Sequence, residues 1–393
     1  MLERLRCGGG SAAHDGGTAR ARSGTRRSTL LGVSIAVGTV KGVKVALAYG
    51  DADSTHKTPM TPQTHIRFAS VSKAITSAAV LMLDQAGAIS IDDPVAKYVP
   101  QYVQQPVAPP SPGATPTPSG SPRPIEIKDL MSMTSGLPGR AGGDPVLHGD
   151  GPITSAQFFA KINQLKLWGY PGTRWDYSNE SYYLLAQLVQ NVSGMSFADF
   201  LQRKIFQPAG MKDSYSDVGA PDPSLALGYV HFAQSDPFME CPAPDWSGEV
   251  GLGGVISTPS DIVRFDIAVM NGTLLDAQHR KAFLAPAWDF GNGYGYAYGW
   301  FTLPNGLVVH EGDFSTTQTI NAIFPDGTFV VSAANGATLA PFFDRRYYVN
   351  QLQNAYGTTP FPLGTRVDAG PPPGISSFTT CEQLDHMLFD SDS

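Results

Sequence analysis

The pattern of apolar and polar residues predicts strands near both ends of the chain and helices between them. Residues 32–37 and 43–49 are apolar, rich in β-branched side chains, and joined by a Gly-containing turn, which is typical of a hairpin. Toward the C-terminal end, Pro304-Asn305-Gly306 and Pro325-Asp326-Gly327 supply further hairpin turns. Four strands are predicted around these turns, at residues 296–301, 307–310, 319–324 and 328–333. This order favours an α+β fold, with an antiparallel sheet built from both ends, flanked by helices, and an inserted, mainly helical region.

A long apolar run with helical spacing begins at Ser70 and extends to Ala86. Its apolar residues fill nearly every face, which is typical of a helix buried inside a protein. Gly87 suits the position just after the end of such a helix. Ser70 would then lie in the first turn, and Lys73 one turn further on the same face.

Ser70 and Lys73 form a Ser-x-x-Lys pair that is suited to nucleophilic catalysis. A serine hydroxyl becomes a nucleophile when a neighbouring base takes its proton. Burial lowers the pKa of an ammonium, so a buried lysine can be that base, and a helix N-terminus favours negative charge on Ser70. Taken alone, the pair fits equally well a capping serine and a lysine that extends to solvent. A second copy, Ser54-Thr55-His56-Lys57, precedes two prolines without a helical pattern and is interpreted as a surface turn.

The remaining pattern divides the chain into one large domain, residues 29–357, and two tails. Residues 1–28 are rich in Gly, Ala, Ser and Arg and are expected to be disordered, and residues 358–393 form the second tail. A helical subdomain is expected at about residues 88–250, interrupted by a Pro-rich loop insertion at residues 104–124. Further helices are predicted at residues 125–131, 158–167, 180–193, 197–205, 259–270 and 341–355.

Composition excludes several classes of function. The net charge of −7 argues against a nucleic-acid-binding surface. The three cysteines are far apart, and the sequence has no His-x-x-x-His or Cys-x-x-Cys, so we expect no disulfide framework, metal site or cofactor. No apolar run reaches the ~18 residues of a membrane span. Arg26-Arg27 before an apolar stretch superficially resembles an export signal, but the stretch is short, β-branched and lacks an Ala-x-Ala site, so a cytoplasmic location is favoured. The oligomeric state stays open.

Two further triplets carry polar groups of the kind that a serine hydrolase uses. Tyr177-Ser178-Asn179 lies at a turn that enters a helix, where a phenol near an ammonium can shuttle protons. His310-Glu311-Gly312 ends a strand, and its glycine would let a substrate approach the backbone. Each triplet also has a copy elsewhere, Tyr348-Val349-Asn350 and His14-Asp15-Gly16, so neither identifies a site by itself.

In this order and context the three motifs resemble one family, the serine β-lactamase-like hydrolases. It includes class C β-lactamases, D-alanyl-D-alanine carboxypeptidases, D-aminopeptidases and β-lactamase-fold esterases, and the resemblance runs from about Leu31 to Tyr356. Four stretches add to it: Phe68-Ala69-Ser70-Val71-Ser72-Lys73, Met133-Thr134-Ser135-Gly136-Leu137-Pro138, Pro171-Gly172-Thr173 and Gly253-Gly254-Val255-Ile256-Ser257-Thr258. Tyr-x-Asn as the second motif points to the class C side of the family.

The resemblance implies a β-lactamase/transpeptidase-like fold and a role for each motif residue. Ser70 would be the nucleophile, Lys73 and Tyr177 would share the acid and base work, and Asn179 would orient Lys73 and the substrate. His310 and Gly312 would border the substrate, and the backbone N–H groups of Ser70 and Asp313 would form the oxyanion hole. The implied function is a serine hydrolase that cleaves esters or amides through an acyl-enzyme.

The sequence departs from the family after the third motif. Where a second glycine is common, this chain has Asp313-Phe314-Ser315, so two acids, Glu311 and Asp313, flank Gly312. A carboxylate substrate would be repelled by them, which favours neutral or amine-bearing substrates. The alternatives are a class C-like β-lactamase or D-alanyl-D-alanine carboxypeptidase that takes a β-lactam or peptide, and a catalytically inactive binding module on the same fold.

Overall fold

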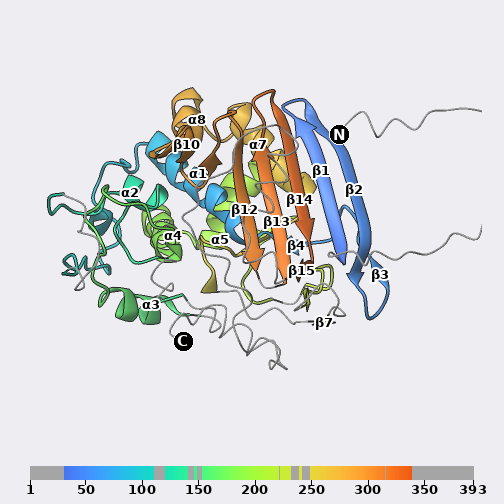
Figure 1. Ribbon diagram of the computed structural model, residues 1–393, viewed down its shortest axis with the longest axis horizontal. Coiled ribbons are helices and arrows are strands. Elements are labelled where there is room, and N and C mark those ends of the chain that lie inside the picture. The colour runs from blue at the N-terminus through green and yellow to red at the C-terminus, as the bar shows by residue number, and fades with distance from the viewer. Residues whose placement is uncertain are drawn as a thin grey trace, which may run out of the picture.

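The computed structural model describes residues 31–109, 120–139, 146–147, 153–220, 222–231, 239–240, 248–314 and 316–338. Its centre is a nine-stranded antiparallel sheet with the strand order β3-β2-β1-β14-β13-β12-β11-β10-β9 (Figure 1). β1 and β14, from opposite ends of the described chain, pair side by side in this sheet. The expected α+β fold with an antiparallel sheet built from both ends is therefore confirmed.

The strands of the large sheet are β1 (Gly32–Thr39), β2 (Gly42–Asp53), β3 (Thr58–Pro59), β9 (Trp288–Gly291), β10 (Tyr294–Tyr296), β11 (Phe301–Thr302), β12 (Val308–Phe314), β13 (Thr317–Ile323) and β14 (Thr328–Ala334). One small sheet contains β4 (Ile66–Arg67), β8 (Val255–Ser257) and β5 (Tyr215–Ser216). A second small sheet contains β15 (Gly336–Thr338), β6 (Tyr229–His231) and β7 (Met239–Glu240).

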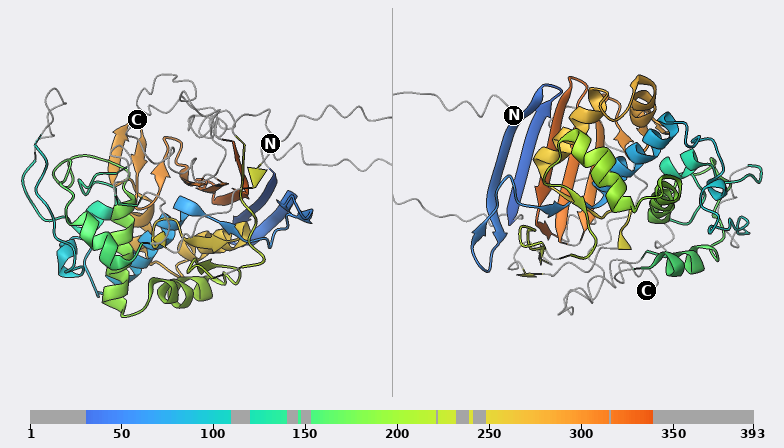
Figure 2. Two further views of the ribbon diagram at one scale, coloured as in Figure 1. Left: turned by 90° about the horizontal axis from the view of Figure 1, so that it is seen from below. Right: turned by 180° about the vertical axis from the view of Figure 1, so that it is seen from behind.

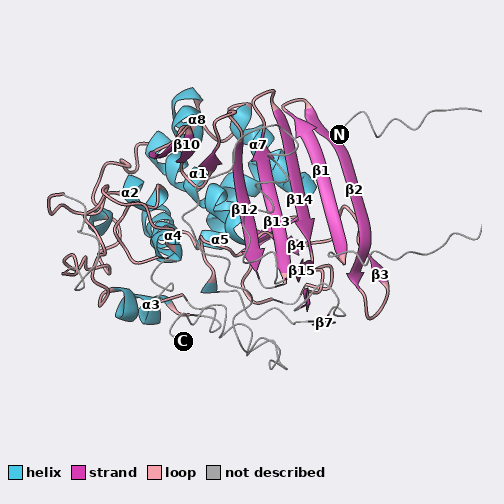
Figure 3. Cartoon of the chain, viewed as in Figure 1, coloured by secondary structure: helices cyan, strands magenta, loops and turns pink. Residues whose placement is uncertain are grey.

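The helices gather beside the sheet and over one of its faces (Figures 2 and 3). They are α1 (Ser72–Gln85), α2 (Ile127–Met131), α3 (Ser155–Ile162), α4 (Asn179–Ser193), α5 (Phe197–Phe200), α6 (Gln207–Ala209), α7 (Pro259–Met270) and α8 (Ala277–Leu284). Two 3-10 turns, η2 (Ala69–Val71) and η3 (Val95–Lys97), and a π-helical turn, η5 (Leu201–Phe206), complete the set.

The two faces of the sheet differ because side chains alternate along each strand. On the helical face α7 packs so closely on β1 that a Cβ at Gly38 would lie 2.4 Å from Val263 Cγ1. On the opposite face, the alternate residues Val45, Leu47 and Tyr49 of β2 are 41%, 42% and 61% exposed. Among the described elements, the helices therefore cover only one face, which we call the inner face.

The predicted buried helix is α1, which runs beside the large sheet, between it and helix α4 (Figure 1). Eleven of its fourteen residues are buried. It packs against α4 and α8. Its apolar pattern on all sides therefore reflects neighbours on all sides. It ends as predicted, because Gly87 follows the last turn with the positive φ of +69° that glycine adopts readily.

Two predicted elements need correction, and two further elements were not predicted. The strand predicted at 296–301 is two short strands, β10 and β11, because Gly299 makes a turn with φ of +83°. The helix predicted at 158–167 begins earlier, since the Thr154 side chain caps it, and ends at Ile162. The strand β9 and the helix α8 are not among the elements that the pattern predicted. The helix predicted at 341–355 and both tails lie outside the described residues.

The Pro-rich segment is better ordered at its ends than its composition predicts. The Ala108 backbone N–H donates to Leu167 O at 2.7 Å, and the Leu167 N–H donates to Pro106 O at 3.1 Å. At the other end, the Gln104 side chain donates to Arg123 O and accepts from Ile125 N. Residues 110–119, between these ends, lie outside the described part of the chain.

A buried acid lies where α7 meets the sheet. Asp266 of α7 has no exposed surface and accepts a hydrogen bond of 3.0 Å from the Asn321 side chain of β13. Burial raises the pKa of Asp266 well above its usual value, against the opposing effect of the Asn321 hydrogen bond. The folded protein therefore holds this proton more tightly than the unfolded chain does.

Asp266 should consequently make the fold less stable as the pH rises above about 4, where an exposed aspartate ionises. We expect Asp266→Asn to flatten this dependence and to raise the melting temperature at pH 8 by about 2 °C or more. The control is Asp326→Asn in the exposed β13–β14 turn, which should change neither. An unchanged pH profile of the melting temperature in Asp266→Asn would contradict the buried-acid interpretation.

Candidate active site

Ser70 lies in the 3-10 turn η2, two residues before α1 begins at Ser72. The sequence had placed it in the first turn of the α-helix. The residue before it, Ala69, has a left-handed backbone with φ of +48°, which is unfavourable for a residue with a Cβ. Such strain persists only where the surrounding structure holds it. Ser70 itself is half-buried, so its hydroxyl stands at the edge of the core.

Lys73 is completely buried, and its amine bonds to acceptors on two segments. Lys73 Nζ donates to Ser70 Oγ at 3.0 Å and to the backbone oxygen of Leu252 at 2.9 Å. The predicted proximity of Ser70 and Lys73 is therefore confirmed as a direct hydrogen bond. The Nζ also lies 4.9 Å from the ring centre of Tyr177 and 5.7 Å from that of Tyr182.

The segment before β8 supplies contacts that the sequence did not reveal. Besides the Leu252 carbonyl, Gly251 O accepts from the Thr76 side chain at 2.6 Å, and Val255 N donates to Ser72 Oγ at 3.1 Å. These bonds attach one side of α1 to residues 251–255. In the sequence, the adjacent Gly253-Gly254 pair marks this segment, but it does not indicate which backbone carbonyl accepts a hydrogen bond from Lys73.

Tyr177 and Asn179 lie where α4 begins, as predicted, with Ser178 as the capping residue. The residues on both sides of Tyr177 bond to the same residue, Met133, which follows α2 by two positions. Asp176 N donates to Met133 O at 2.9 Å, and Ser178 N donates to Met133 Sδ at 3.3 Å. Tyr177 is buried and Asn179 is half-buried as the first residue of α4.

Gly312 brings β12 against the turn that carries Ser70. A Cβ at Gly312 would lie 2.2 Å from Phe68 O and 2.3 Å from Thr319 Oγ1. Thr319 on β13 donates its hydroxyl to the same Phe68 O at 2.9 Å. Glycine is therefore required here by the close approach of two backbones.

A second close approach lies at Gly299, between β10 and β11. A Cβ there would lie 2.9 Å from both the Cα and the N of Ala74, at the backbone of α1 next to Lys73. The two contacts fix the sheet against both ends of the Ser70–Lys73 turn.

His310 is buried on the inner face, and its ring centre lies 6.2 Å from that of Tyr177. Burial first, and then the positive charge of Lys73, lower the pKa of His310 to about 3. The ring is therefore neutral at ordinary pH. Its Nδ1 lies 2.6 Å from the Glu311 carbonyl oxygen, an acceptor, so this nitrogen is assigned the proton.

Glu311 and Asp313 alternate with His310 and Gly312 along β12, so their side chains leave the strand on the opposite, outer face. Burial and the neighbouring charge of Asp313 raise the pKa of Glu311 to about 8. Strand alternation therefore directs both side chains away from Ser70, so repulsion of a carboxylate substrate by these two acids does not follow from their position.

Further aromatic rings pack around Tyr177 and His310. Trp175 packs edge-to-face on Phe290 at 4.9 Å and on Tyr296 at 5.5 Å between ring centres. The ring of Phe301 lies 5.7 Å from that of His310. Trp175, Phe290 and Phe301 are half-buried, so this aromatic cluster keeps some exposed apolar surface.

The structure brings Ser70, Lys73, Tyr177, His310 and Gly312 together from three segments of the chain. The second Ser-x-x-Lys, by contrast, forms the exposed turn between β2 and β3, as predicted. In the described part of the chain no group of three or more His, Cys, Asp or Glu is placed to hold a metal ion. None of the helices described is both long and apolar enough to cross a membrane.

Comparison with known proteins gives matches over most of the chain. The family model described as Beta-lactamase matches residues 19–355. Two penicillin-binding proteins of Bacillus subtilis (strain 168) are 26% and 29% identical over 72% and 70% of this chain. The chain spans 65% and 61% of the length of these two relatives.

Solved structures with the same fold include enzymes of two kinds. The D-amino acid amidase of Ochrobactrum anthropi SV3 matches with a TM-score of 0.64 at 24% identity, over 79% of this chain and 87% of that one. EstCE1, a hydrolase with promiscuous acyltransferase activity, matches with a TM-score of 0.65 at 20% identity, over 78% and 89%. At these identities the likeness shows the fold, and it confirms the predicted β-lactamase/transpeptidase-like architecture.

Gly312→Ala should destabilise the protein, because its Cβ has no room between Phe68 and Thr319. Overpacking of this kind costs about 1–3 kcal/mol, so the melting temperature should fall by several degrees. The matched control is Gly169→Ala, where a Cβ would make only ordinary contacts of 3.6 Å with its nearest neighbours. Equal melting temperatures for the two variants in a calorimeter would show that β12 does not press on η2.

Proposed function

This chain belongs to the beta-lactamase family, and from that premise we propose that it is a serine hydrolase that cleaves esters or amides through an acyl-enzyme on Ser70. The observation that carries the proposal is the 3.0 Å hydrogen bond between Lys73 Nζ and Ser70 Oγ, with the amine fully buried and the hydroxyl at the edge of the core. A nucleophile and its base need this hydrogen-bond distance.

In the proposed reaction, the neutral amine of Lys73 takes the hydroxyl proton while Ser70 Oγ bonds to the substrate carbonyl carbon. The carbonyl oxygen becomes an oxyanion, which the backbone N–H groups of Ser70 and Asp313 would stabilise. Collapse of this intermediate expels the alcohol or amine, which leaves with the proton. Water then attacks the acyl carbon while the same groups take one of its protons. The bond between this carbon and Ser70 Oγ breaks, the carboxylic acid is released, and the proton taken from water passes to Ser70 Oγ.

Tyr177 is proposed to share the proton with Lys73. The ring of Tyr177 lies beside Lys73 Nζ, and its neighbours Asp176 and Ser178 are held by Met133. Two ionisable groups this close titrate as a pair, so either can supply the acid or the base in a given step. Asn179 at the start of α4 is proposed to orient the substrate.

The substrate class is proposed from the charges and rings around the site. His310 is neutral, and the cations nearest to the motifs in sequence are engaged: Arg67 pairs with Asp217, and Arg174 packs on the ring of Trp168. The aromatic cluster offers apolar surface for an acyl or leaving group. These features favour neutral esters, or substrates with a free amine, over anionic β-lactams.

The main alternative is a β-lactamase or D-alanyl-D-alanine carboxypeptidase. One observation favours it: the carboxylates of Glu311 and Asp313 leave β12 on the outer face, so they present no strong barrier to an anionic substrate. The names of the Bacillus subtilis relatives point the same way. A binding module without catalysis remains the alternative of a different class.

Covalent labelling tests the proposal. A fluorophosphonate probe should increase the intact mass of the native protein by one probe adduct, located at Ser70. Ser70→Ala should stay unlabelled, and its melting temperature should be unchanged. Ser54→Ala is the matched control from the exposed Ser-x-x-Lys and should label normally. In Lys73→Met and in Tyr177→Phe the rate of labelling should fall about 100-fold or more, which is within the usual effect of a lost general acid or base.

Turnover of p-nitrophenyl acetate and butyrate completes this test. A native protein that takes neither a fluorophosphonate nor a penicillin at Ser70, and turns over no ester, would be a binding module. Full activity of Tyr177→Phe at every pH would remove Tyr177 from the mechanism.

Substrate charge gives a separate prediction. The native enzyme should show a higher kcat/KM for p-nitrophenyl butyrate than for nitrocefin, and Glu311→Thr with Asp313→Gly should change this ratio by less than about threefold. The physical reason is that both side chains leave β12 on the face away from Ser70, and that the raised pKa of Glu311, about 8, keeps this group mostly uncharged at neutral pH. A tenfold shift toward nitrocefin in the double variant would place the two carboxylates in the substrate's field.

A further inference from the structure

The turn that leads to Tyr177 is held by the end of α2 and by the Pro-rich segment. Three backbone bonds attach residues 168–176 to the strip just after α2: Trp168 N to Gly136 O at 2.7 Å, Gly172 N to Thr134 O at 2.8 Å, and Asp176 N to Met133 O at 2.9 Å. Whatever fixes this strip therefore also fixes the backbone around Tyr177.

Asp129 fixes the strip from within. Its side chain accepts from Glu126 N at 2.8 Å and so caps α2, and its backbone oxygen accepts from Thr134 N at 2.8 Å. The side chain is only 4% exposed, so its charge needs a close partner.

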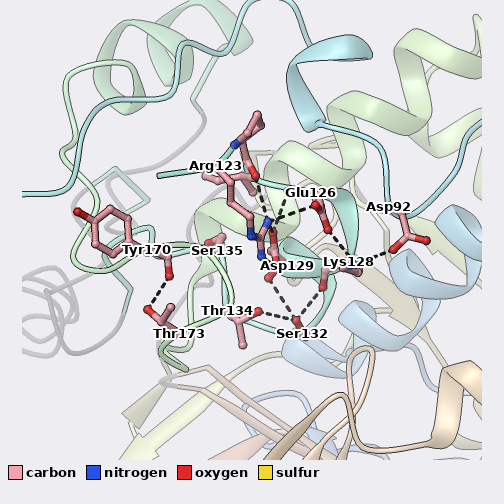
Figure 4. Close-up of polar contacts among 12 residues, drawn as sticks. Asp92, Arg123, Glu126, Lys128, Asp129, Ser132, Thr134, Ser135, Tyr170 and Thr173 are labelled. Carbon is pink, nitrogen blue, oxygen red and sulfur yellow. Dashed lines mark hydrogen bonds and ion pairs between the residues drawn. The ribbon is translucent and has the colours of Figure 1, made fainter. Parts of the chain in front are cut away.

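Arg123 provides that partner, and it also covers the turn. Its two terminal nitrogens bond to both oxygens of Asp129, at 2.6 and 2.8 Å (Figure 4). The same guanidinium lies over Gly172, where a Cβ would come within 2.8 Å of Arg123 Nη2. Gly172 has φ of +79°, so the turn has no side chain at the one point where the arginine lies against it.

The Pro-rich segment reaches the same turn by a second route. A Cβ at Gly120 would lie 2.7 Å from Thr173 Cγ2 and 3.0 Å from Tyr170 Cβ. Thr173 in turn donates its hydroxyl to Tyr170 O at 2.7 Å, which closes the turn (Figure 4). The end of the insertion thus lies against the residues that precede the second motif.

We propose that Arg123 is a positioning residue that fixes the turn carrying Tyr177, an inference that rests on the proposed function. The two terminal nitrogens of the Arg123 guanidinium form a fork that holds both oxygens of Asp129, and the same guanidinium lies against the turn at Gly172. Gly120 and Arg123 lie in the C-terminal end of the insertion, so this described end is part of the frame of the site. Its loss should leave substrate binding nearly intact and should slow the step in which Tyr177 takes part.

Steady-state kinetics of Arg123→Met test this role. We expect kcat for p-nitrophenyl butyrate to fall about tenfold, as expected for a small misplacement of a catalytic group, while KM changes less than about threefold. Arg123→Lys keeps the charge but loses the fork, so its kcat should lie between those of the native enzyme and Arg123→Met. Gly172→Ala should act in the same direction, and its effect should not multiply with that of Arg123→Met, since the two residues are in contact.

Lys128→Met is the matched control. Lys128 is on α2, as Asp129 is, and pairs with Asp92 at 2.6 Å and with Glu126 at 2.8 Å, on the side away from the turn (Figure 4). The other oxygen of Glu126 lies 3.6 Å from Arg123 Nη1. Its kcat should stay within about twofold of the native value. An equal loss in Lys128→Met and Arg123→Met would mean that α2 stability alone matters, and would overturn the proposal.

Amide hydrogen exchange supplies a readout that does not depend on catalysis. In Arg123→Met the amides of residues 168–178 should exchange faster, while those of α7 should not change. Failure of the native protein to acylate Ser70 would refute the proposed function, whereas unchanged exchange or full kcat in Arg123→Met would refute the positioning role. Should Arg123→Met fail to fold, Arg123→Lys and Gly172→Ala decide by the same measurements.

Discussion

The complete burial of Lys73 is the constraint on which the rest of the site depends. An amine without access to water must find its acceptors inside the protein, because an unpaired buried charge or polar group is costly. The acceptors here are a hydroxyl from the turn before α1 and a carbonyl from the segment before β8, with the faces of Tyr177 and Tyr182 beside them. One buried side chain thus joins α1, residues 251–255 and the start of α4.

Two close backbone contacts complete this arrangement. Gly312 on β12 meets the turn at Phe68, and Gly299 meets the backbone of α1 at Ala74. Side chains at these positions would separate the sheet from the helix and widen the site. The left-handed backbone of Ala69 lies between them, so tight packing from the sheet is what holds the unfavourable conformation next to Ser70.

The sheet also separates charge from the site. Its inner face presents a neutral His310 toward Tyr177, whereas Glu311 and Asp313 belong to the outer face. Before Tyr177 in the chain, Arg123 neutralises Asp129, the buried acid of α2, and lies against the turn at Gly172. These acids are therefore directed to the outer face or paired, and the proposed reaction depends on the proton between Lys73, Ser70 and Tyr177.

Local pattern was enough to predict the elements whose form depends on their own residues. Three elements were predicted in this way: α1, which is apolar on nearly every face, the hairpin of β1 and β2, and α7 from Pro259 to Met270. Their signals are the spacing of apolar residues, turn glycines and capping residues, all of which lie within or next to the element itself. The motif residues Ser70, Lys73 and Tyr177 were identified for the same reason, with family resemblance joining them. Tertiary packing alone decided the rest. The break at Gly299, the left-handed Ala69, the acceptor at Leu252 and the face taken by Glu311 follow from which backbones meet across the fold, and no local pattern records those distances.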